Sequence, residues 1–418
     1  MPTVSDLSAA DTAWMLVSTA LVLVMTPALG FFYGGMVRAK NALNTIMMSF
    51  TALGFVGLAW ALVGYSLAFA DGSNWIGGLG FGFLSNVGLE AKGTIPHVLF
   101  MSYQGTFAVI TAALVSGAIV ERMKFGPYLV FITLWSVLVY SPVAHWVWGG
   151  GWLGKLGALD FAGGTVVHIN AAAAALVIAL VVGARKDYAR QAIVPHNVPF
   201  TLLGTAIVWF GWFGFNAGSA LAATPLAALA FANTMFAPMA ALVVWSLLDL
   251  RRTGKATAVG AATGIVVGLV AVTPAAGFVS PLSAIVIGGI AAGASYHALL
   301  WRARTRLDDS LDVVSAHGVG GIVGALLTGV LADRAWNGVA DGALFGNFSQ
   351  LGVQSLAILA TVAYSALGTY VILKLIVLLA GLRATSREEG IGLDVTQHGE
   401  EAYSRGEGAI LVQPERSR

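Results

Sequence analysis

The stretch DFAGGTVVHINAAAAA at residues 160–175 places one histidine, His168, inside a run of apolar and small residues. A second stretch, VVSAHGVGGIVG at residues 313–324, again holds one histidine, His317, followed by small residues. Small residues permit close contact between membrane helices. We interpret both stretches as transmembrane helices that each bring a buried histidine against a neighbouring helix.

Apolar runs like these recur along the whole chain between short polar breaks. A helix of about 20 mostly apolar residues crosses the roughly 30 Å hydrocarbon core of a bilayer. Eleven runs meet that length, at residues 12–35, 42–70, 98–120, 126–147, 162–183, 198–219, 227–249, 257–277, 280–301, 313–332 and 351–380. We predict an all-α polytopic membrane protein with eleven transmembrane helices in residues 1–380, followed by a polar tail at residues 381–418.

The composition agrees with a membrane protein and excludes several other classes. Of the 418 residues, 57% are hydrophobic and only 10% are charged, whereas an ordinary soluble domain has about 25% charged residues. The net charge of +2 provides no basic field for nucleic acid. The absence of cysteine excludes thiolate metal sites, haem attachment and thiol catalysis.

The basic residues set the expected orientation, because Lys and Arg are retained on the cytoplasmic side of a membrane. The breaks after spans 1, 3, 5, 7 and 9 hold Arg38, Lys40, Arg122, Lys124, Arg185, Lys186, Arg190, Arg251, Arg252, Lys255, Arg302, Arg304 and Arg306. The other breaks hold only Lys92, Lys155 and Arg334. We expect a plasma or inner membrane protein with its N-terminus outside and its C-terminus in the cytoplasm. The first residues carry no basic region, so we expect no cleavable signal peptide.

The two histidine-bearing helices are spans 5 and 10, so they cross the membrane in opposite directions. This is the pattern of an inverted repeat, spans 1 to 5 against spans 6 to 10, with span 11 left over. Transporters built in this way place their site near the membrane midplane, at the interface between the repeats.

A single histidine inside a helix is most often a neutral core residue that donates to a backbone carbonyl. Two at matching repeat positions favour a shared site, because ionisable groups inside a membrane usually line a pathway. A zinc site is the alternative, but it needs at least three protein ligands and no third lies at usable spacing. The histidines toward the helix ends are His97, His145, His196 and His297. We therefore expect no metal and a neutral imidazole pair, His168 and His317, suited to a small polar solute or a proton relay.

The outer mouth of the predicted bundle is rich in aromatic residues. Phe107, Trp148 and Ser219 fall near the outer ends of their helices, as do Trp212 and Phe215. Most such aromatics are only interfacial anchors. The first three residues are alternatively a vestibule, since ring faces attract a cation by roughly 0.5 to 2 kcal/mol and a hydroxyl accepts a hydrogen bond.

An acidic residue stands at the start of each histidine-bearing helix. Asp160 is expected to be the N-cap of span 5, and its carboxylate also favours a cation at the pore entrance. Asp312 is expected to cap span 10 in the same way at the opposite face.

At these residues the chain resembles the ammonium transporter (Amt/Mep/Rh) family, and its microbial Amt branch in particular. The resemblance rests on these strings, in order along the chain: FYGGMVRAKN (32–41), YQGTF (103–107), AHWVWGGG (144–151), GALDFAGGTVVHIN (157–170), GWFGFNAGS (211–219), VTPA (272–275), AHG (316–318) and GLDVTQHGE (392–400). It covers essentially the whole chain. One departure is Tyr103, where close relatives often carry Phe.

The resemblance implies a homotrimer with one pore in each subunit, and no enzymatic activity or cofactor. It implies that Phe107, Trp148 and Ser219 recruit ammonium outside, with Asp160 beneath them, and that Phe107 and Phe215 close the pore. His168 and His317 are then the twin histidines, and Trp212 belongs to the pore wall.

The tail carries the last of the matching strings. Its residues Gly392, Asp394, His398, Gly399 and Glu400 imply regulation by a PII-type signalling protein on the cytoplasmic face. Without the resemblance, the tail is either solvated or a docking element.

The expected mechanism follows from the cost of moving a bare ion into low dielectric, an idealised ~20 kcal/mol. We expect ammonium, or methylammonium as its analogue, to bind outside and to lose a proton near Asp160. Ammonia then crosses along the histidines, with or without the proton. The alternative is an ammonium sensor that signals through cytoplasmic docking, for which a signalling domain after span 11 is the expected feature. A third reading, an intramembrane hydrolase, lacks a metal set or a Ser-His-Asp arrangement.

Overall fold

The computed structural model describes residues 6–403 of the chain. Within them, ten helical segments are long and apolar enough to cross a membrane. They are α1 (Ala9–Met36), η2 to α3 (Ala39–Phe69), α4 with η5 (His97–Ala118), α5 to α7 (Phe125–Lys155), η7 with α8 (Gly164–Val182), α9 with η8 (Val198–Ala220), α10 (Pro225–Thr253), α12 (Pro281–Arg302), η9 with α13 (Val314–Leu331) and α15 (Phe348–Leu379). The shorter apolar helix α11 (Ala258–Val272) is the eleventh. The prediction of an all-α protein with eleven transmembrane helices is confirmed.

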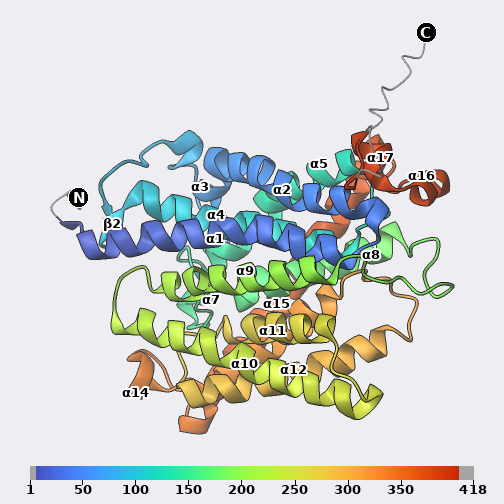
Figure 1. The fold of residues 1–418 in the computed structure, drawn as a ribbon. Helices are drawn as coiled ribbons and strands as arrows, with labels where there is room; N and C mark the ends of the chain where they lie inside the picture. Colours follow the sequence, from blue (N-terminus) through green and yellow to red (C-terminus); the bar gives the residue numbers. More distant parts are fainter. Residues whose placement is uncertain (1–5, 404–418) are drawn as a thin grey trace.

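The helices lie side by side along one direction (Figure 1). The start of α1 lies at one end of the bundle, and the short tail helices α16 (Ser386–Ile391) and α17 (Leu393–His398) lie at the other. We call these the N-terminal end and the tail end. Their opposite placement is what an odd number of membrane crossings requires.

Local sequence signals define where the helices begin and end. Ser8 and Ser280 accept backbone N–H bonds at the starts of α1 and α12, as N-cap residues do. Proline occupies the first turn of α9, α10 and α12, where its missing N–H costs nothing. Gly254 ends α10 in a left-handed conformation, which glycine adopts without strain.

The first helices of the two predicted repeats pack side by side, and each has one face at the surface of the bundle, where Leu16, Val17 and Phe210 are exposed. These helices are α1 and α9, which pack against each other along their length (Figure 1). In the interior of the bundle, the turns η7 (Gly164–Ile169) and η9 (Val314–Val319) also contact each other. Both turns are π-helical, a wide form of helix that is frequent at functional sites. The repeat interface therefore brings the two histidine-bearing segments together.

The tail is docked rather than solvated over its described part. Asp394 accepts backbone N–H bonds from Leu43 at 3.0 Å and Asn44 at 2.7 Å, at the start of α2 (Ala42–Ala59). Gly392 has φ 121°, and a Cβ added there would lie 2.5 Å from the Lys40 carbonyl oxygen. Of the predicted tail at residues 381–418, residues 404–418 lie outside the described part of the chain.

Candidate functional site

Asp160 fixes the start of the helix that carries His168. Its carboxylate accepts backbone N–H bonds from Gly163, Gly164, Thr165 and Val166, at 2.6 to 3.0 Å. Two carboxylate oxygens offer about four lone-pair positions, so these bonds use the acceptor capacity of Asp160. The predicted capping of the first turn by the Asp160 carboxylate is confirmed, although the N-cap position itself is Gly163, and the side chain contributes negative charge and position rather than a free hydrogen-bond acceptor.

Asp309, not Asp312, fixes the start of the helix that carries His317. Its two carboxylate oxygens accept N–H bonds from Val313 at 3.1 Å and Val314 at 2.7 Å. The prediction that Asp312 caps this helix is wrong, because Asp312 has a left-handed backbone with φ 58° and its carboxylate pairs with Arg302 instead. Asp309 precedes His317 by the same number of residues as Asp160 precedes His168.

The two histidines meet in the interior of the bundle. Their Nδ1 atoms lie 3.2 Å apart, and the rings are 1% and 3% exposed for His168 and His317. A hydrogen bond between two ring nitrogens needs a proton on one and a lone pair on the other. One Nδ1 therefore donates and the other accepts, which leaves at least one ring neutral. This matches the imidazole pair expected from the sequence.

A series of rings leads from the N-terminal end of the bundle to this pair. The Phe107 and Phe215 rings lie 4.2 Å apart between centroids. Phe215 in turn lies 6.1 Å from His168, whose ring is nearly parallel to that of Trp212 at 5.3 Å. Residues from α4, α9 and η7 thus form one column, and the sequence had placed each of them only on its own helix.

The space beside the histidines is small and apolar. A cavity of about 20 Å³ is lined by His168, His317, Trp212, Phe215 and aliphatic side chains. Roughly 10 to 15 Å³ is enough for one water-sized molecule. The cavity therefore has room for a molecule the size of water or ammonia and offers only the imidazoles as polar partners.

The residues predicted for the outer vestibule, Phe107, Trp148 and Ser219, lie together with Phe215 and Tyr103 in one group, which we call the aromatic cluster. Trp148 lies edge-on to Phe107 at 5.9 Å, and its indole N–H donates to the Asp160 carbonyl at 2.8 Å. Phe107 is buried, whereas Trp148 and Ser219 are partly exposed. The cluster thus presents the Trp148 ring and the Ser219 hydroxyl toward solvent, at the end of the buried ring column.

The Tyr103 hydroxyl, which is the departure from the family pattern, belongs to the same cluster. It donates to the carbonyls at the end of α9, 2.9 Å from Gly214 O and 3.0 Å from Phe215 O, and lies 3.3 Å from the Ser219 hydroxyl. Ser219 also donates to Phe215 O at 2.8 Å. Tyr103 therefore ties the serine to the ring column and is itself fully buried.

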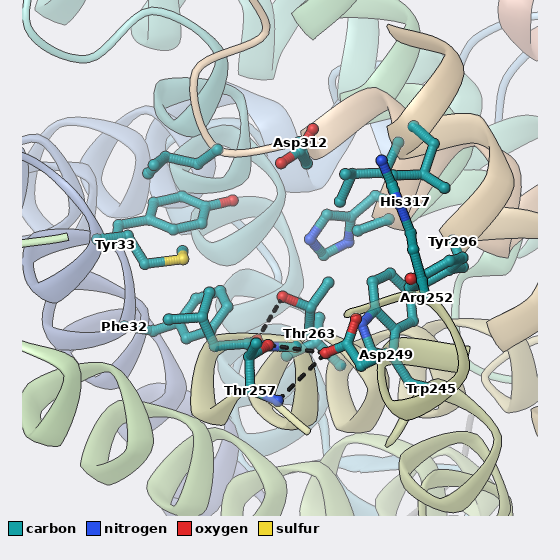
Figure 2. Close-up of a pocket in the computed structure, with 18 of the residues that line it drawn as sticks. Phe32, Tyr33, Trp245, Asp249, Arg252, Thr257, Thr263, Tyr296, Asp312 and His317 are labelled. Carbon is teal, nitrogen blue, oxygen red and sulfur yellow. Dashed lines mark hydrogen bonds between the residues drawn. The ribbon is translucent and has the colours of Figure 1, made fainter. Parts of the chain in front are cut away.

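At the tail end, His317 faces a larger cavity of about 300 Å³, which we call the charged vestibule. Its charged lining side chains are Asp249, Arg252 and Asp312. Asp312 and His317 point into it, and Asp249 lies across it beside Thr257 (Figure 2). The two mouths of the ring column thus differ: one is aromatic and the other carries charges of both signs.

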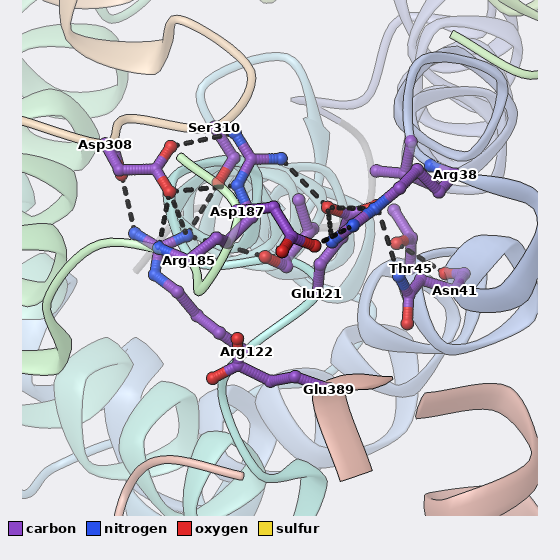
Figure 3. A network of polar contacts seen from close by, with 12 residues as sticks. Arg38, Asn41, Thr45, Glu121, Arg122, Arg185, Asp187, Asp308, Ser310 and Glu389 are labelled. Atoms are coloured by element: carbon purple, nitrogen blue, oxygen red, sulfur yellow. Dashed lines mark hydrogen bonds and ion pairs between the residues drawn. The ribbon is translucent and has the colours of Figure 1, made fainter. Parts of the chain in front are cut away.

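A network of buried charges lies next to the charged vestibule and joins four connecting segments (Figure 3). Glu121 pairs with Arg38 at 2.9 Å and with Arg185 at 3.0 Å, and Arg185 also pairs with Asp308 at 2.8 Å. Burial favours a higher pKa for Glu121, but the two arginines outweigh it and lower the pKa. In the sequence, Arg38 and Arg185 stand out only as basic loop residues, and no local signal pairs them with Glu121 or Asp308.

The tail motif contacts the same face of the bundle. His398 Nε2 lies 2.9 Å from the Asn44 side-chain nitrogen, and Glu389 pairs with Arg383 at 2.7 Å. Gly399 ends α17 with φ 70°, and Glu400 follows it in an exposed position. The predicted tail residues up to Gly399 are therefore structured around the start of α2.

Comparisons with known proteins agree over nearly the whole chain. A sequence model described as Ammonium Transporter Family matches residues 13–403. An ammonium transporter of Bacillus subtilis is 49% identical, over 94% of this chain and 98% of its own length. The ammonium transporter Amt1 of Archaeoglobus fulgidus is 47% identical, over 95% of this chain and 100% of its own length.

Solved structures with the same fold include Mep2 of Saccharomyces cerevisiae. It has a TM-score of 0.86 and 36% identity, covering 92% of this chain and 90% of that chain. A structure described as a sensor Amt protein has a TM-score of 0.87 and 29% identity, covering 93% of this chain and 98% of that chain.

Proposed function

This chain belongs to the ammonium transporter family, and from that premise we propose that ammonia crosses each subunit along the ring column, past His168 and His317. The chain is a multi-pass membrane transporter of ammonium and not an enzyme. The observation that carries the proposed route is the unbroken series of rings from Phe107 through Phe215 and His168 to His317.

We propose that the N-terminal end faces outward and the tail end faces the cytoplasm. The basic residues of the loops support this orientation, because Arg38, Arg122, Arg185 and Arg302 all lie in segments at the tail end. The aromatic cluster is then the outer mouth, and the charged vestibule opens toward the cytoplasm.

Recruitment of ammonium is assigned to the aromatic cluster. The faces of Trp148 and Phe107 attract a small cation by roughly 0.5 to 2 kcal/mol, and the Ser219 oxygen accepts one of its hydrogen bonds. Asp160 lies directly behind, since Trp148 donates to its carbonyl. Its carboxylate, already occupied by four N–H bonds, adds a favourable field without holding the ion.

The ion then transfers a proton to water at the partly exposed mouth before ammonia enters the column, and the histidine pair later accepts that proton for relay. Transfer of a bare ion into low dielectric costs an idealised ~20 kcal/mol, and the 20 Å³ cavity supplies only two imidazoles in return. Neutral ammonia has no such cost. Phe107 and Phe215, in contact at 4.2 Å, act as the gate that admits it.

The histidine pair guides ammonia and relays the proton. The Nδ1–Nδ1 hydrogen bond holds the two rings in line and leaves one nitrogen of each ring for the solute. His168 Nε2 has no hydrogen-bond partner among the described residues, as a group that meets a transported molecule requires. Trp212 fixes the His168 ring from one side and is itself held by Thr273 at 3.0 Å.

We further propose a homotrimer with one pore in each subunit, and a PII-type partner at the tail end. Exposed large apolar side chains on α9, α10 and α12, such as Phe210, Phe231 and Ile290, supply surface for neighbouring copies as well as for lipid. Single-cysteine cross-linking tests the trimer directly, because the chain has no other cysteine. The docked tail, from Gly392 to Glu400, is the surface offered to the partner.

Sensing is the second candidate function, because the fold is also that of the sensor Amt protein. The sequence identities favour transport, at 49% for the Bacillus subtilis transporter against 29% for the sensor. Uptake separates the two functions, since a sensor binds ammonium without accumulating it.

The test is uptake of radiolabelled methylammonium into proteoliposomes, together with ammonium-evoked currents on solid-supported membranes. His168→Ala is expected to abolish proton-linked current or to change ion selectivity. His297→Ala, which removes an exposed histidine from α12, is the matched control and should behave as the native chain. A current of unchanged size and selectivity in His168→Ala contradicts the proton role. No uptake by the native chain contradicts transport altogether.

A further inference from the structure

The two repeats differ at one backbone position that is left-handed in both. Gly163 lies between Asp160 and His168 and has φ 112°. Asp312 holds the same position between Asp309 and His317 and has φ 58°. Glycine adopts this region freely, whereas a residue with a side chain is disfavoured there. The second repeat thus carries a carboxylate, Asp312, at the position where the first repeat has Gly163.

The Asp312 side chain lies on the wall between two cavities at the tail end. One is the charged vestibule, which begins at His317 (Figure 2). The other, of about 360 Å³, is lined by Tyr188, Arg185 and Arg302. Both cavities are lined by Met36, Val259, Leu311 and Asp312. A solute that leaves His317 through the charged vestibule therefore passes the carboxylate of Asp312.

Arg302 is the charge that balances this carboxylate. Its Nη2 lies 2.7 Å from Asp312 Oδ1, and its side chain is only 13% exposed. Nη1 lies 3.5 Å from the Tyr188 hydroxyl, which positions the guanidinium from its other side. The second carboxylate of the vestibule, Asp249, is occupied by Thr257, whose hydroxyl donates to it at 2.8 Å. Asp312 is thus the acid that would stand free if Arg302 were neutral.

We propose that Arg302 is a specificity-determining residue for release, in that it prevents Asp312 from holding ammonium in the charged vestibule. This rests on the proposed function, in which ammonia reaches the cytoplasmic side past His317 and regains a proton there. A bare carboxylate beside that exit is a cation site. The same carboxylate paired with a guanidinium is not, so the exit has low affinity for ammonium.

Because Arg302 and Asp312 carry opposite charges, removing one or the other should shift the inhibition by internal ammonium in opposite directions. Arg302→Gln leaves Asp312 unpaired and should make internal ammonium a stronger inhibitor of uptake. Asp312→Gly removes the carboxylate that pairs with Arg302 and should make internal ammonium a weaker inhibitor, without distorting a backbone that already suits glycine. A general loss of structure would move both variants in the same direction.

The experiment uses the full chain in proteoliposomes, with the fraction of each orientation established by protease access to the tail. Methylammonium uptake is measured at a fixed external concentration while internal ammonium is varied. A unit charge about 4 to 6 Å away changes affinity by about a hundredfold or more at an effective dielectric constant of about 20 and by only a few-fold in bulk water, and the partly exposed Asp312 lies between these limits. We therefore expect the internal concentration for half-inhibition to fall about tenfold in Arg302→Gln.

Two controls distinguish an effect of the Arg302–Asp312 pair from a general effect of removing charge. Arg304→Gln removes an exposed charge from the same loop, and its half-inhibition should match the native chain. Arg302→Gln/Asp312→Gly removes both charges and should return half-inhibition toward the native value. The proposal is overturned if native and Arg302→Gln chains share one half-inhibition value, or if Arg302→Gln and Asp312→Gly shift it in the same direction. Absence of uptake in the native chain is a failure of the proposed function instead.

Discussion

The Asp160 half and the Asp309 half of the molecule start their histidine-bearing helices in the same register but with different chemistry. Asp160 accepts four N–H bonds and has an aromatic cluster above it. Asp309 accepts two N–H bonds and lies among ionic residues, with its chain neighbour Asp308 and with Asp312 and Arg302 close by. The inverted repeat therefore fixes where the histidines lie, while the surroundings of each carboxylate give the two mouths different properties.

The largest expected loss of stability comes from removing the carboxylate of Asp160, which accepts more hydrogen bonds than that of Asp309. Asp160→Ala leaves four buried N–H groups unpaired, and each costs about 1 kcal/mol or more, so we expect a loss of about 4 kcal/mol. Asp309→Ala leaves two, and we expect about half that loss. Thermal unfolding in detergent measures both, and methylammonium uptake should be abolished in Asp160→Ala. Equal destabilisation by the two variants would contradict the difference between the halves.

The next effect tests the charge network at the tail end, which Asp308, the neighbour of Asp309, joins through Arg185. Glu121→Gln keeps the shape of the side chain but leaves Arg38 and Arg185 without their shared carboxylate. Removing one partner of a buried ion pair costs about 3 kcal/mol, and this loss should appear as a lower midpoint of unfolding. Glu90→Gln, which alters a partly exposed carboxylate that contacts His97 at the N-terminal end, is the control and should change the midpoint little. Comparable midpoints of unfolding for the two variants would show that the charge network does not stabilise the fold.

Acid should weaken the same network. The pKa of Glu121 is lowered from its usual 4.5, because the guanidinium charges outweigh the effect of burial. A carboxyl with a depressed pKa in the folded state contributes stability that is present above the unfolded pKa and lost as the pH falls through the folded one. The native midpoint should therefore decline below about pH 4.5, and Glu121→Gln should show a shallower decline. Parallel declines would assign the acid sensitivity to other groups.

The sequence predicted the features that show as a pattern within one segment, and it did not predict the contacts that join segments far apart in the chain. The helices and the paired histidines follow from apolar runs and from residues repeated at matching positions. The aromatic vestibule was expected from residues near the outer helix ends, and its role from the family resemblance. The cap of the second helix was assigned to Asp312 because it directly precedes the apolar run, although the spacing from Asp160 to His168 already indicated Asp309. A left-handed backbone at an aspartate has no sequence signal of its own.

Other features could not be predicted because they join distant segments. Glu121 pairs with Arg38 and Arg185, and Asp394 caps the start of α2 from the far end of the chain. Each of these charges looks like an ordinary loop residue in the sequence. Their pairing is decided by which connecting segments meet when the helices pack, and no single-segment pattern contains that information.

A smaller effect is expected from filling the glycine position of the Asp160 half. Gly163→Ala forces a side chain into a backbone with φ 112°, and the new Cβ would lie 2.6 Å from a Val167 methyl and 3.2 Å from the Trp148 ring. Strain of this kind costs about 2 kcal/mol. Thermal unfolding measures it, and Gly126→Ala, with no atom within 4 Å of the added Cβ, is the control. Tolerance of alanine at Gly163 would show that the turn adapts.

The smallest effect is expected from the reverse change in the Asp309 half. Asp312→Gly relieves a left-handed backbone, which favours the variant by about 1 kcal/mol, and removes a partly exposed ion pair worth about 0 to 1 kcal/mol. The two contributions oppose each other, so unfolding should change by less than about 1 kcal/mol. A loss as large as that in Gly163→Ala would mean that Asp312 holds the fold together. A near-zero change would mean instead that the carboxylate is dispensable for folding, and that its place beside Arg302 and the charged vestibule serves transport.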